Sequence, residues 1–197
     1  MSAEGTPEEL AGQVVISFAS VPDCEAWFAE HSGDHRGIWL KIGKVGAAQT
    51  VTYAQALEIA LCHGWIDGQK QGYDETHWLQ RFTPRGPRSK WSQINRDKAE
   101  ALIKAGRMHM AGQMQVDAAK ADGRWAAAYA GQKSATVPDD LATALAADPE
   151  AKAFFETLTG ANRYEILYRV HDAKKPETRA ARIAKFVEMC RNHETLH

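Results

Sequence analysis

The segment from Trp65 to Thr83 constrains the fold most, because it predicts a β-hairpin near the middle of the chain. Its two halves, WIDGQKQ at residues 65–71 and HWLQRFT at residues 77–83, have the pattern of strands. GYDE follows the first half and supplies turn residues. Alternation along the two strands then places one set of side chains on a common face: Trp65, Asp67, Gln69, Trp78, Gln80 and Phe82.

The pairing of the two strands decides whether this face is a binding surface. A four-residue loop pairs Asp67 with Gln80 and Trp65 with Phe82. A carboxylate and two amides among three large aromatic side chains suit a ligand site, which has apolar walls and few polar groups. The alternative is a solvated face whose aromatic side chains pack on a neighbouring helix. Gly68 inside the first strand indicates either a bulge or a close backbone approach.

The helix that leads into the hairpin raises the question of a catalytic cysteine. Thr52 is a good N-cap for this helix, and Gly64 supplies its C-terminal stop. Cys62, His63 and Asp67 then stand within six residues, as in a Cys/His/Asp constellation. A reactive thiolate needs a helix N-terminus or a nearby cation, whereas Cys62 lies near a helix C-terminus, where the dipole disfavours negative charge. We therefore predict that Cys62 is packed and inert.

A basic segment after the hairpin is the second candidate for binding. Arg81, Arg85, Arg88 and Lys90 follow one another without an intervening acid, beside Trp91 and ahead of a predicted helix. Guanidinium groups and helix N–H groups are typical of anion sites, and aromatics among basic residues also suit single-stranded nucleic acid. The plain alternative is a solvated basic surface. The predicted ligand-binding residues are Trp65, Asp67, Trp78, Gln80, Arg81, Arg85, Arg88, Lys90 and Trp91.

The rest of the first two thirds of the chain predicts a mixture of strands and helices. Residues 1–12 are polar and acidic and are predicted to be a disordered leader. The further predicted elements are strands at residues 13–20 and 38–44 and helices at residues 22–31, 95–106 and 109–123. Asn95 is the expected N-cap of its helix. The last of these helices carries small and apolar residues at helical spacing: Ala111, Met114, Ala118 and Ala121.

Beyond a short polar linker at residues 131–140, the sequence is helical throughout. The predicted helices are residues 138–147, 149–158, 159–171 and 176–190, three of which begin with proline. In the last helix, a core stripe is expected from Ala180, Ile183, Val187 and Cys190. The predicted fold class is α+β, with a small antiparallel sheet and helices in the order β-α-β-α-β-β, followed by a C-terminal helical bundle. The expected domains are residues 13–130 and 136–191.

Composition excludes several classes of protein. The 24 Lys and Arg residues against 25 Asp and Glu residues leave a net charge of -1, which argues against a chain devoted as a whole to nucleic acid or acidic membranes. The three cysteines form no Cys-x-x-Cys pair, so a zinc ribbon and a disulfide framework are both excluded. No apolar run approaches the roughly 20 residues of a membrane span. We predict a cytoplasmic protein with no cofactor and no bound metal.

Several motifs occur in the order of one bacterial family. They are ALCHGWIDGQ, QRFTPRGPRSKWSQIN, AGRM, ADGRW, PDDLATALAADPEAKAFFETL and KPETRAARIAK. In these motifs the chain resembles the YdeI/OmpD-associated, or bacteriocin-protection (OmdA-like), family. The resemblance implies a link to antimicrobial-peptide or envelope-stress resistance and carries no established catalytic residues. Two positions depart from the family pattern: His63 stands where an aromatic residue is usual, and His109-Met110 replaces a Thr-Pro helix start.

The leading hypothesis is a cytoplasmic protein that binds a small anionic or aromatic ligand. Asp67 would orient a donor group of the ligand, while Arg85 and Arg88 would hold a phosphate or carboxylate. A nucleic-acid-binding protein is one alternative. An enzyme that uses Asp67 as general base is another, and a protein-partner interface is a third.

Overall fold

The computed structural model describes residues 8–33 and 36–196, which divide into two compact units. The first unit comprises residues up to Lys90 together with Asn95–Ala126, and the second comprises Trp91–Ile94 with the chain from Ala127 onward. The described residues form eight helices and a five-stranded sheet, so the predicted α+β class is confirmed. Among them, no helix is both long enough and apolar enough to cross a membrane.

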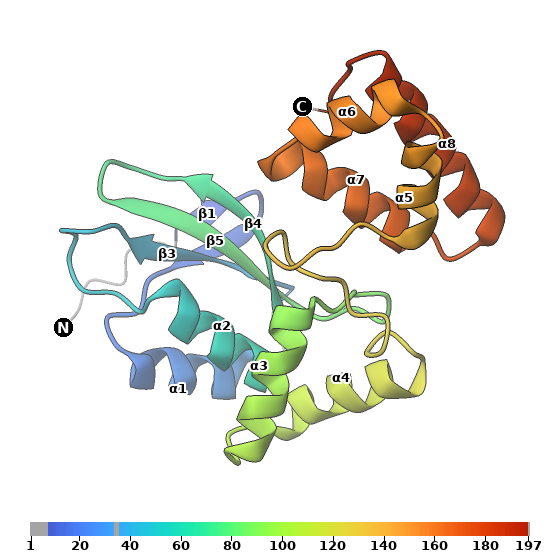
Figure 1. Cartoon of the computed structure of the whole chain (residues 1–197). Helices are drawn as coiled ribbons and strands as arrows, with labels where there is room; N and C mark the ends of the chain where they lie inside the picture. Colours follow the sequence, from blue (N-terminus) through green and yellow to red (C-terminus); the bar gives the residue numbers. More distant parts are fainter. Residues whose placement is uncertain (1–7, 34–35, 197) are drawn as a thin grey trace, which may run out of the picture. The chain divides into compact units, whose positions relative to one another are not determined.

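The sheet of the first unit has the strand order β1-β2-β3-β5-β4 (Figure 1). Its strands are β1 (Glu9–Leu10), β2 (Gln13–Ile16), β3 (Ile38–Gly43), β4 (Trp65–Gly72) and β5 (His77–Pro84). β2 and β3 pair in parallel, and every other pair is antiparallel. The predicted antiparallel sheet is therefore mixed, because a helix crosses over between β2 and β3 and returns the chain in the same direction.

The N-terminal edge of the sheet corrects the prediction of a leader without structure. Residues 1–7 lie outside the described residues, but Glu9 and Leu10 pair with Val14 and Gln13. Ala11 and Gly12 form the connection, with φ angles of 52° and 71°. Two successive positive φ angles are those of the tight turns that match the twist of a hairpin. The leader prediction was therefore wrong for these residues, because a local turn outweighed their polar composition.

The β4–β5 hairpin forms at the predicted residues, but the predicted register was wrong. Asp67 pairs with Phe82, and Lys70 with Gln80, so Gly68 and Gln69 lie together opposite a single residue as a bulge. The loop is also longer than predicted, since Gly72 pairs with Trp78. The bulge moves Lys70, in place of Gln69, onto the common face. Trp65, Asp67, Trp78, Gln80 and Phe82 share that face as predicted.

Helices α1 (Val21–His31) and α2 (Tyr53–Cys62) lie side by side against one face of this sheet (Figure 1). The Ser20 side chain caps α1, and a capping box formed by Thr52 and Gln55 begins α2. The core between the helices and the sheet consists of fully buried aromatic and aliphatic residues, which include Phe28, Ile38, Leu40, Ala56, Ala60, Trp65 and Phe82. Their burial explains why β3 is apolar on this side.

Helices α3 (Gln93–Lys104) and α4 (Met110–Ala121) follow β5 in the chain. The predicted cap role of Asn95 was wrong, because this buried residue lies inside α3. The face of α4 was also different from the predicted stripe. Met114 is 62% exposed, whereas Gly112, Val116 and Ala119 are buried. Gly112 decides this orientation, because a Cβ added there would lie 2.3 Å from the carbonyl oxygen of Cys62.

The second unit is a bundle of α5 (Asp139–Ala146), α6 (Pro149–Thr157), α7 (Gly160–Asp172) and α8 (Pro176–Arg191). Its core includes Leu141, Phe155, Ile166, Val170 and Phe186. Ile183, Val187 and Cys190 of the predicted α8 stripe are buried, but Ala180 is exposed. Outside the core, the Arg179 guanidinium forms a two-pronged ion pair with Asp140 and lowers the pKa of that carboxyl group.

Candidate functional site

Asp67 lies on β4 with both carboxylate oxygens engaged by neighbouring helices. Oδ2 accepts a hydrogen bond of 2.8 Å from the hydroxyl of Tyr53 on α2. Oδ1 accepts one of 3.3 Å from the side-chain amide of Asn95 on α3. The half-buried carboxylate therefore joins the sheet to two helices, and its orientation is set before any ligand arrives.

Two of the predicted site residues, Trp65 and Gln80, are buried and hold the hairpin. Trp65 is 1% exposed; its indole N–H donates to the carbonyl oxygen of Ser32 at 3.1 Å, and its ring packs edge-on against Phe28. The side-chain amide of Gln80 donates to the carbonyl oxygens of Gly68 at 2.9 Å and Gln69 at 3.2 Å. Gln80 thus satisfies the carbonyls that the bulge leaves without strand partners.

Trp78 lies at an open depression with two lysines, which we call the Trp78 shelf. The shelf has a volume of about 650 Å³ and is lined by Lys44, Val45, Lys70, Gln71, Gly72 and Trp78. The Lys70 ammonium lies 4.2 Å from the centroid of the Trp78 ring, in cation–π contact. The Tyr53 ring lies 6.1 Å from the same indole. Since Asp67 holds the Tyr53 hydroxyl, the carboxylate is connected to the shelf through one side chain.

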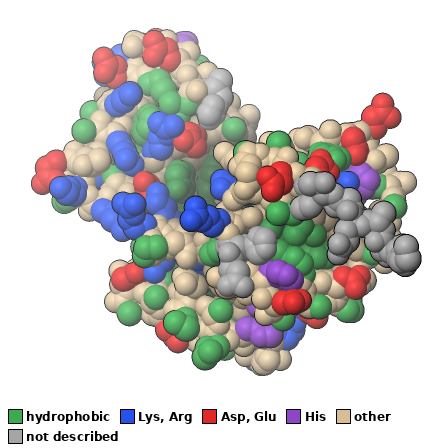
Figure 2. Space-filling model, turned by 180° about the vertical axis from the view of Figure 1, so that it is seen from behind, with side chains coloured by type: hydrophobic (Ala, Val, Ile, Leu, Met, Phe, Trp, Pro, Cys, Tyr) green, Lys and Arg blue, Asp and Glu red, His purple; other side chains and the backbone are tan. Residues whose placement is uncertain are grey.

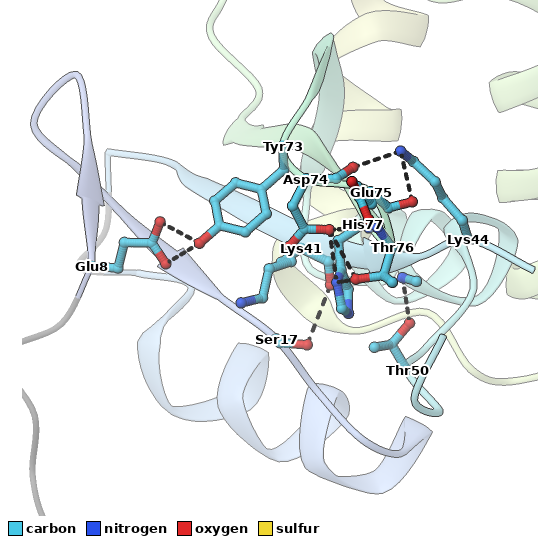
Figure 3. Close-up of polar contacts among 11 residues, drawn as sticks. Glu8, Ser17, Lys41, Lys44, Thr50, Tyr73, Asp74, Glu75, Thr76 and His77 are labelled. Carbon is cyan, nitrogen blue, oxygen red and sulfur yellow. Dashed lines mark hydrogen bonds and ion pairs between the residues drawn. The ribbon is translucent and has the colours of Figure 1, made fainter. Parts of the chain in front are cut away.

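The tip of the hairpin fixes Lys44 at the rim of the Trp78 shelf (Figure 3). Its ammonium donates to the carbonyl oxygens of Asp74 at 2.7 Å and Glu75 at 3.4 Å. One carboxylate oxygen of Asp74 accepts from the backbone N–H groups of Thr76 and His77. Desolvation acts to raise the pKa of Asp74, but hydrogen bonds from Thr76 and His77 lower it to about 2. The turn is therefore ordered by an ionised carboxylate.

In the structure, the residues of the predicted basic segment do not form one site. Arg81 points to the sheet face opposite Trp78, where its Nε donates to the side-chain oxygen of Gln13 at 2.9 Å. Arg85 is 5% exposed, and its guanidinium donates to the carbonyl oxygen of Lys90 at 3.1 Å. Arg88 and Lys90 are exposed. Trp91 is buried and is assigned to the second unit.

Three residues of this region were missed by sequence reasoning: Tyr53, Lys44 and Lys70. Tyr53 follows a helix N-cap and Lys44 follows a strand, and neither position has a local signal for function. Simple alternation along the strand puts Gln69, and not Lys70, on the face of Trp78. The one available signal was Gly68, since a bulge at that residue reverses the faces of the residues that follow.

A second depression lies between α1, the end of α2 and residues 106–109, and we call it the His63 pocket. It has a volume of about 490 Å³ and is lined by Glu25, Ala26, Ala29, Ile59, Cys62, His63, Gly106, Arg107, Met108 and His109. The two positions that depart from the family pattern meet here, because the His63 and His109 rings stack with centroids 4.2 Å apart. Figure 2 shows histidine side chains beside acidic and basic ones near the lower edge of the molecule.

Burial controls the chemistry of the His63 pocket. Burial and the neighbouring His109 lower the pKa of His63 to about 4, so the ring is neutral at physiological pH. Burial raises the pKa of Cys62 to about 11, which agrees with the prediction of an inert thiol. Across the described part of the chain, no group of three or more His, Cys, Asp or Glu residues is arranged to hold a metal ion.

Comparisons with known proteins gave two family models that match successive parts of the chain. A family model described as bacteriocin-protection, YdeI or OmpD-associated matches residues 134–193, and a model of a domain of unknown function, DUF8412, matches residues 16–115. Neither the curated proteins nor the solved structures gave a match. The DUF8412 model spans half of the chain, so the chain belongs to that family, and residues 134–193 match the bacteriocin-protection, YdeI or OmpD-associated model, as the motifs predicted.

Proposed function

We propose that the first unit binds a small ligand that is both anionic and aromatic, at the Trp78 shelf. The observation that carries this proposal is the cation–π pair in an open depression, where the Lys70 ammonium lies 4.2 Å from the Trp78 ring centroid. The arrangement offers an aromatic face and two ammonium groups, Lys70 and Lys44, within one concave surface.

The expected binding mode is an exchange of partners at Trp78. A ligand ring would stack on the indole in place of the ammonium, and stacking on an aromatic side chain contributes about 1–3 kcal/mol for a nucleobase. The displaced Lys70 would then pair with the carboxylate or phosphate of the ligand. Lys44 would add a second charge from a position that the turn carbonyls already hold.

Asp67 acts in this proposal as a positioning residue rather than as a direct ligand contact. Its carboxylate anchors the hydroxyl of Tyr53, whose ring centroid lies 6.1 Å from that of Trp78. The predicted general-base role of Asp67 is an alternative, but both of its oxygens already accept hydrogen bonds from protein donors. The anion-holding roles of Arg85, Arg88 and Lys90 stay predictions, as do nucleic-acid binding, a protein partner and a cytoplasmic location.

Calorimetry with a matched pair of probes tests the proposal. Indole-3-acetate is an anionic aromatic compound, and indole-3-acetamide is its neutral analogue. We expect the acid to bind more tightly than the amide, and about tenfold more weakly to Lys70→Gln than to the wild type, a loss of about 1.4 kcal/mol. Trp78→Leu should abolish binding.

Lys98→Gln is the matched control, because Lys98 lies on the same unit but pairs with Glu58. Equal affinity for the acid and the amide, or unchanged affinity in both Lys70→Gln and Trp78→Leu, would overturn the proposal. For the nucleic-acid alternative, the result to look for is an oligonucleotide affinity that falls steeply with salt.

A further inference from the structure

We propose that the His63 pocket is a second binding site, which takes a small, flat, uncharged ring able to exchange hydrogen bonds with the His63 imidazole. This inference goes beyond the Trp78 shelf, since it concerns other residues and a ligand of different charge. The pocket volume of about 490 Å³ lies in the range of small-molecule sites.

The main observation is a buried polar ring that has no protein partner. His63 is 7% exposed and lines the pocket. Within the described chain, its ring nitrogens have no hydrogen bond or ion pair, and the ring makes only stacking contacts. The imidazole nitrogens are hydrogen-bonding groups, and the pocket gives room for a partner that the chain does not supply. A ligand in the pocket would supply it.

The imidazole contacts two neighbouring rings. The Phe28 ring centroid lies 5.7 Å from it, and the His109 ring stacks on it at 4.2 Å. Since His109 already covers one face of His63, a ligand ring can use the nitrogen-bearing edge. Beside the pocket, the tight approach of Gly112 to the lining residue Cys62 locks α4 against α2. The polar edge is thus oriented before binding.

The charges around the pocket favour an uncharged ligand. Arg107 pairs with Glu58 at 3.0 Å and with Glu25 at 3.7 Å, so the one guanidinium in the lining is already neutralised. The uncharged part of the lining includes two alanines, an isoleucine, a methionine and the protonated Cys62 thiol. His63, whose pKa of about 4 keeps it neutral, offers one donor and one acceptor. A heteroaromatic or phenolic ring satisfies these groups without bringing an unpaired charge into the site.

A metal ion fits the pocket poorly. The rings of His63 and His109 are within 24° of parallel, so their in-plane lone pairs do not converge on one point. The Cys62 thiol, with a pKa raised to about 11, is protonated at neutral pH and is a poor metal ligand in that form. The stacked pair is therefore better suited to present one hydrogen-bonding edge than to chelate.

The test uses the full chain at neutral pH and two uncharged probes, pyrazole and phenol, with benzoate as the charged comparison. Histidine side-chain ¹⁵N NMR spectra report on His63 and His109 directly. We expect saturable shifts of the His63 ring nitrogens with pyrazole or phenol, and little response to benzoate. His63→Phe, which keeps a stacked ring but removes the nitrogens, should weaken probe binding about tenfold.

A second variant tests the pocket independently in case His63→Phe does not fold. Ala29 lies on the exposed side of α1 and lines the pocket, so Ala29→Phe should block the site while the unit stays folded. Lys70→Gln at the Trp78 shelf should leave these shifts unchanged, which separates this inference from the proposed function. The inference would be overturned by His63 nitrogens that respond to neither probe, as when only water fills the site. Equal binding to wild type, His63→Phe and Ala29→Phe would overturn it as well.

Discussion

The Trp78 shelf and the His63 pocket lie on the same unit and present opposite kinds of polar group. The shelf has two ammonium groups beside a half-buried indole, held by cation–π contact and by turn carbonyls. The pocket has a neutral imidazole in contact with two rings, with its neighbouring charges paired among themselves. The difference teaches that burial can change the form of a titratable group, because desolvation removes the charge from His63.

The largest expected effect is a loss of stability in acid through His63. The folded-state pKa of about 4 lies below the ordinary histidine value of 6.5, which applies to the unfolded chain. As the pH falls from 6.5 to 4, the unfolded chain therefore binds a proton that the folded chain does not bind. Full stability is present above that window, and about 3 kcal/mol is lost across it. Urea denaturation at a series of pH values measures this loss.

His63→Phe is the control for the acid effect. It should remove the part of the pH dependence that lies in this window, since a phenyl ring has no proton to bind. A wild-type free energy of unfolding that stays constant down to the lower end of the window would contradict a neutral, buried His63.

Gly112→Ala disturbs the packing of α4 on α2 beside the pocket and should destabilise the chain by about 2 kcal/mol, in the range of overpacking. The added Cβ would lie 2.3 Å from the Cys62 carbonyl oxygen, so α4 must move away from α2. Gly33→Ala is the matched control, because nothing lies within 4 Å of a Cβ at that position. Thermal unfolding of both variants measures the difference, and equal melting temperatures would show that α4 is not tightly packed there.

Removing the hydrogen bond between Tyr53 and Asp67 should lower the stability by a smaller amount. Tyr53→Phe deletes a hydrogen bond of 2.8 Å to a carboxylate that keeps its second donor, Asn95, and should cost about 1 kcal/mol. If Asp67 positions the shelf, this variant should also weaken indole-3-acetate binding. A normal affinity in a destabilised Tyr53→Phe variant would confine Asp67 to a structural role. Asp97→Asn, at an exposed carboxylate, is the control for stability.

The smallest expected change in stability is that of Lys70→Gln. A cation–π contact at an exposed site contributes about 0.5–1 kcal/mol, and it weakens as salt screens the charge. The free energy of unfolding should therefore change little, although ligand affinity falls. A large loss of stability would place Lys70 in the structural framework and remove the distinction between the exposed shelf and the buried pocket.

Interactions between residues close in the sequence predict most helices and strands of the fold, but they predict the candidate sites only in part. The capping box at Thr52 and the stop at Gly64, with a φ of 76°, mark the ends of α2 as predicted. The face that Met114 takes was not predictable from helical spacing, because Gly112, two residues earlier, decides which side of α4 packs on α2. Asn95 has the composition of an N-cap, yet a carboxylate from a distant strand draws its amide into a tertiary hydrogen bond.

By itself, the sequence determined the α+β class, the hairpin, most of the helix starts and the family likeness of the C-terminal helices, because caps, turns and periodicity act between residues close in the chain. Only the tertiary structure decided the register of β4 on β5 after Gly68, the hydrogen bond between Asp67 and Tyr53, and the stacking of His63 on His109. These features join residues on different elements. Their geometry depends on which backbones can approach closely, and that is settled only when the elements pack.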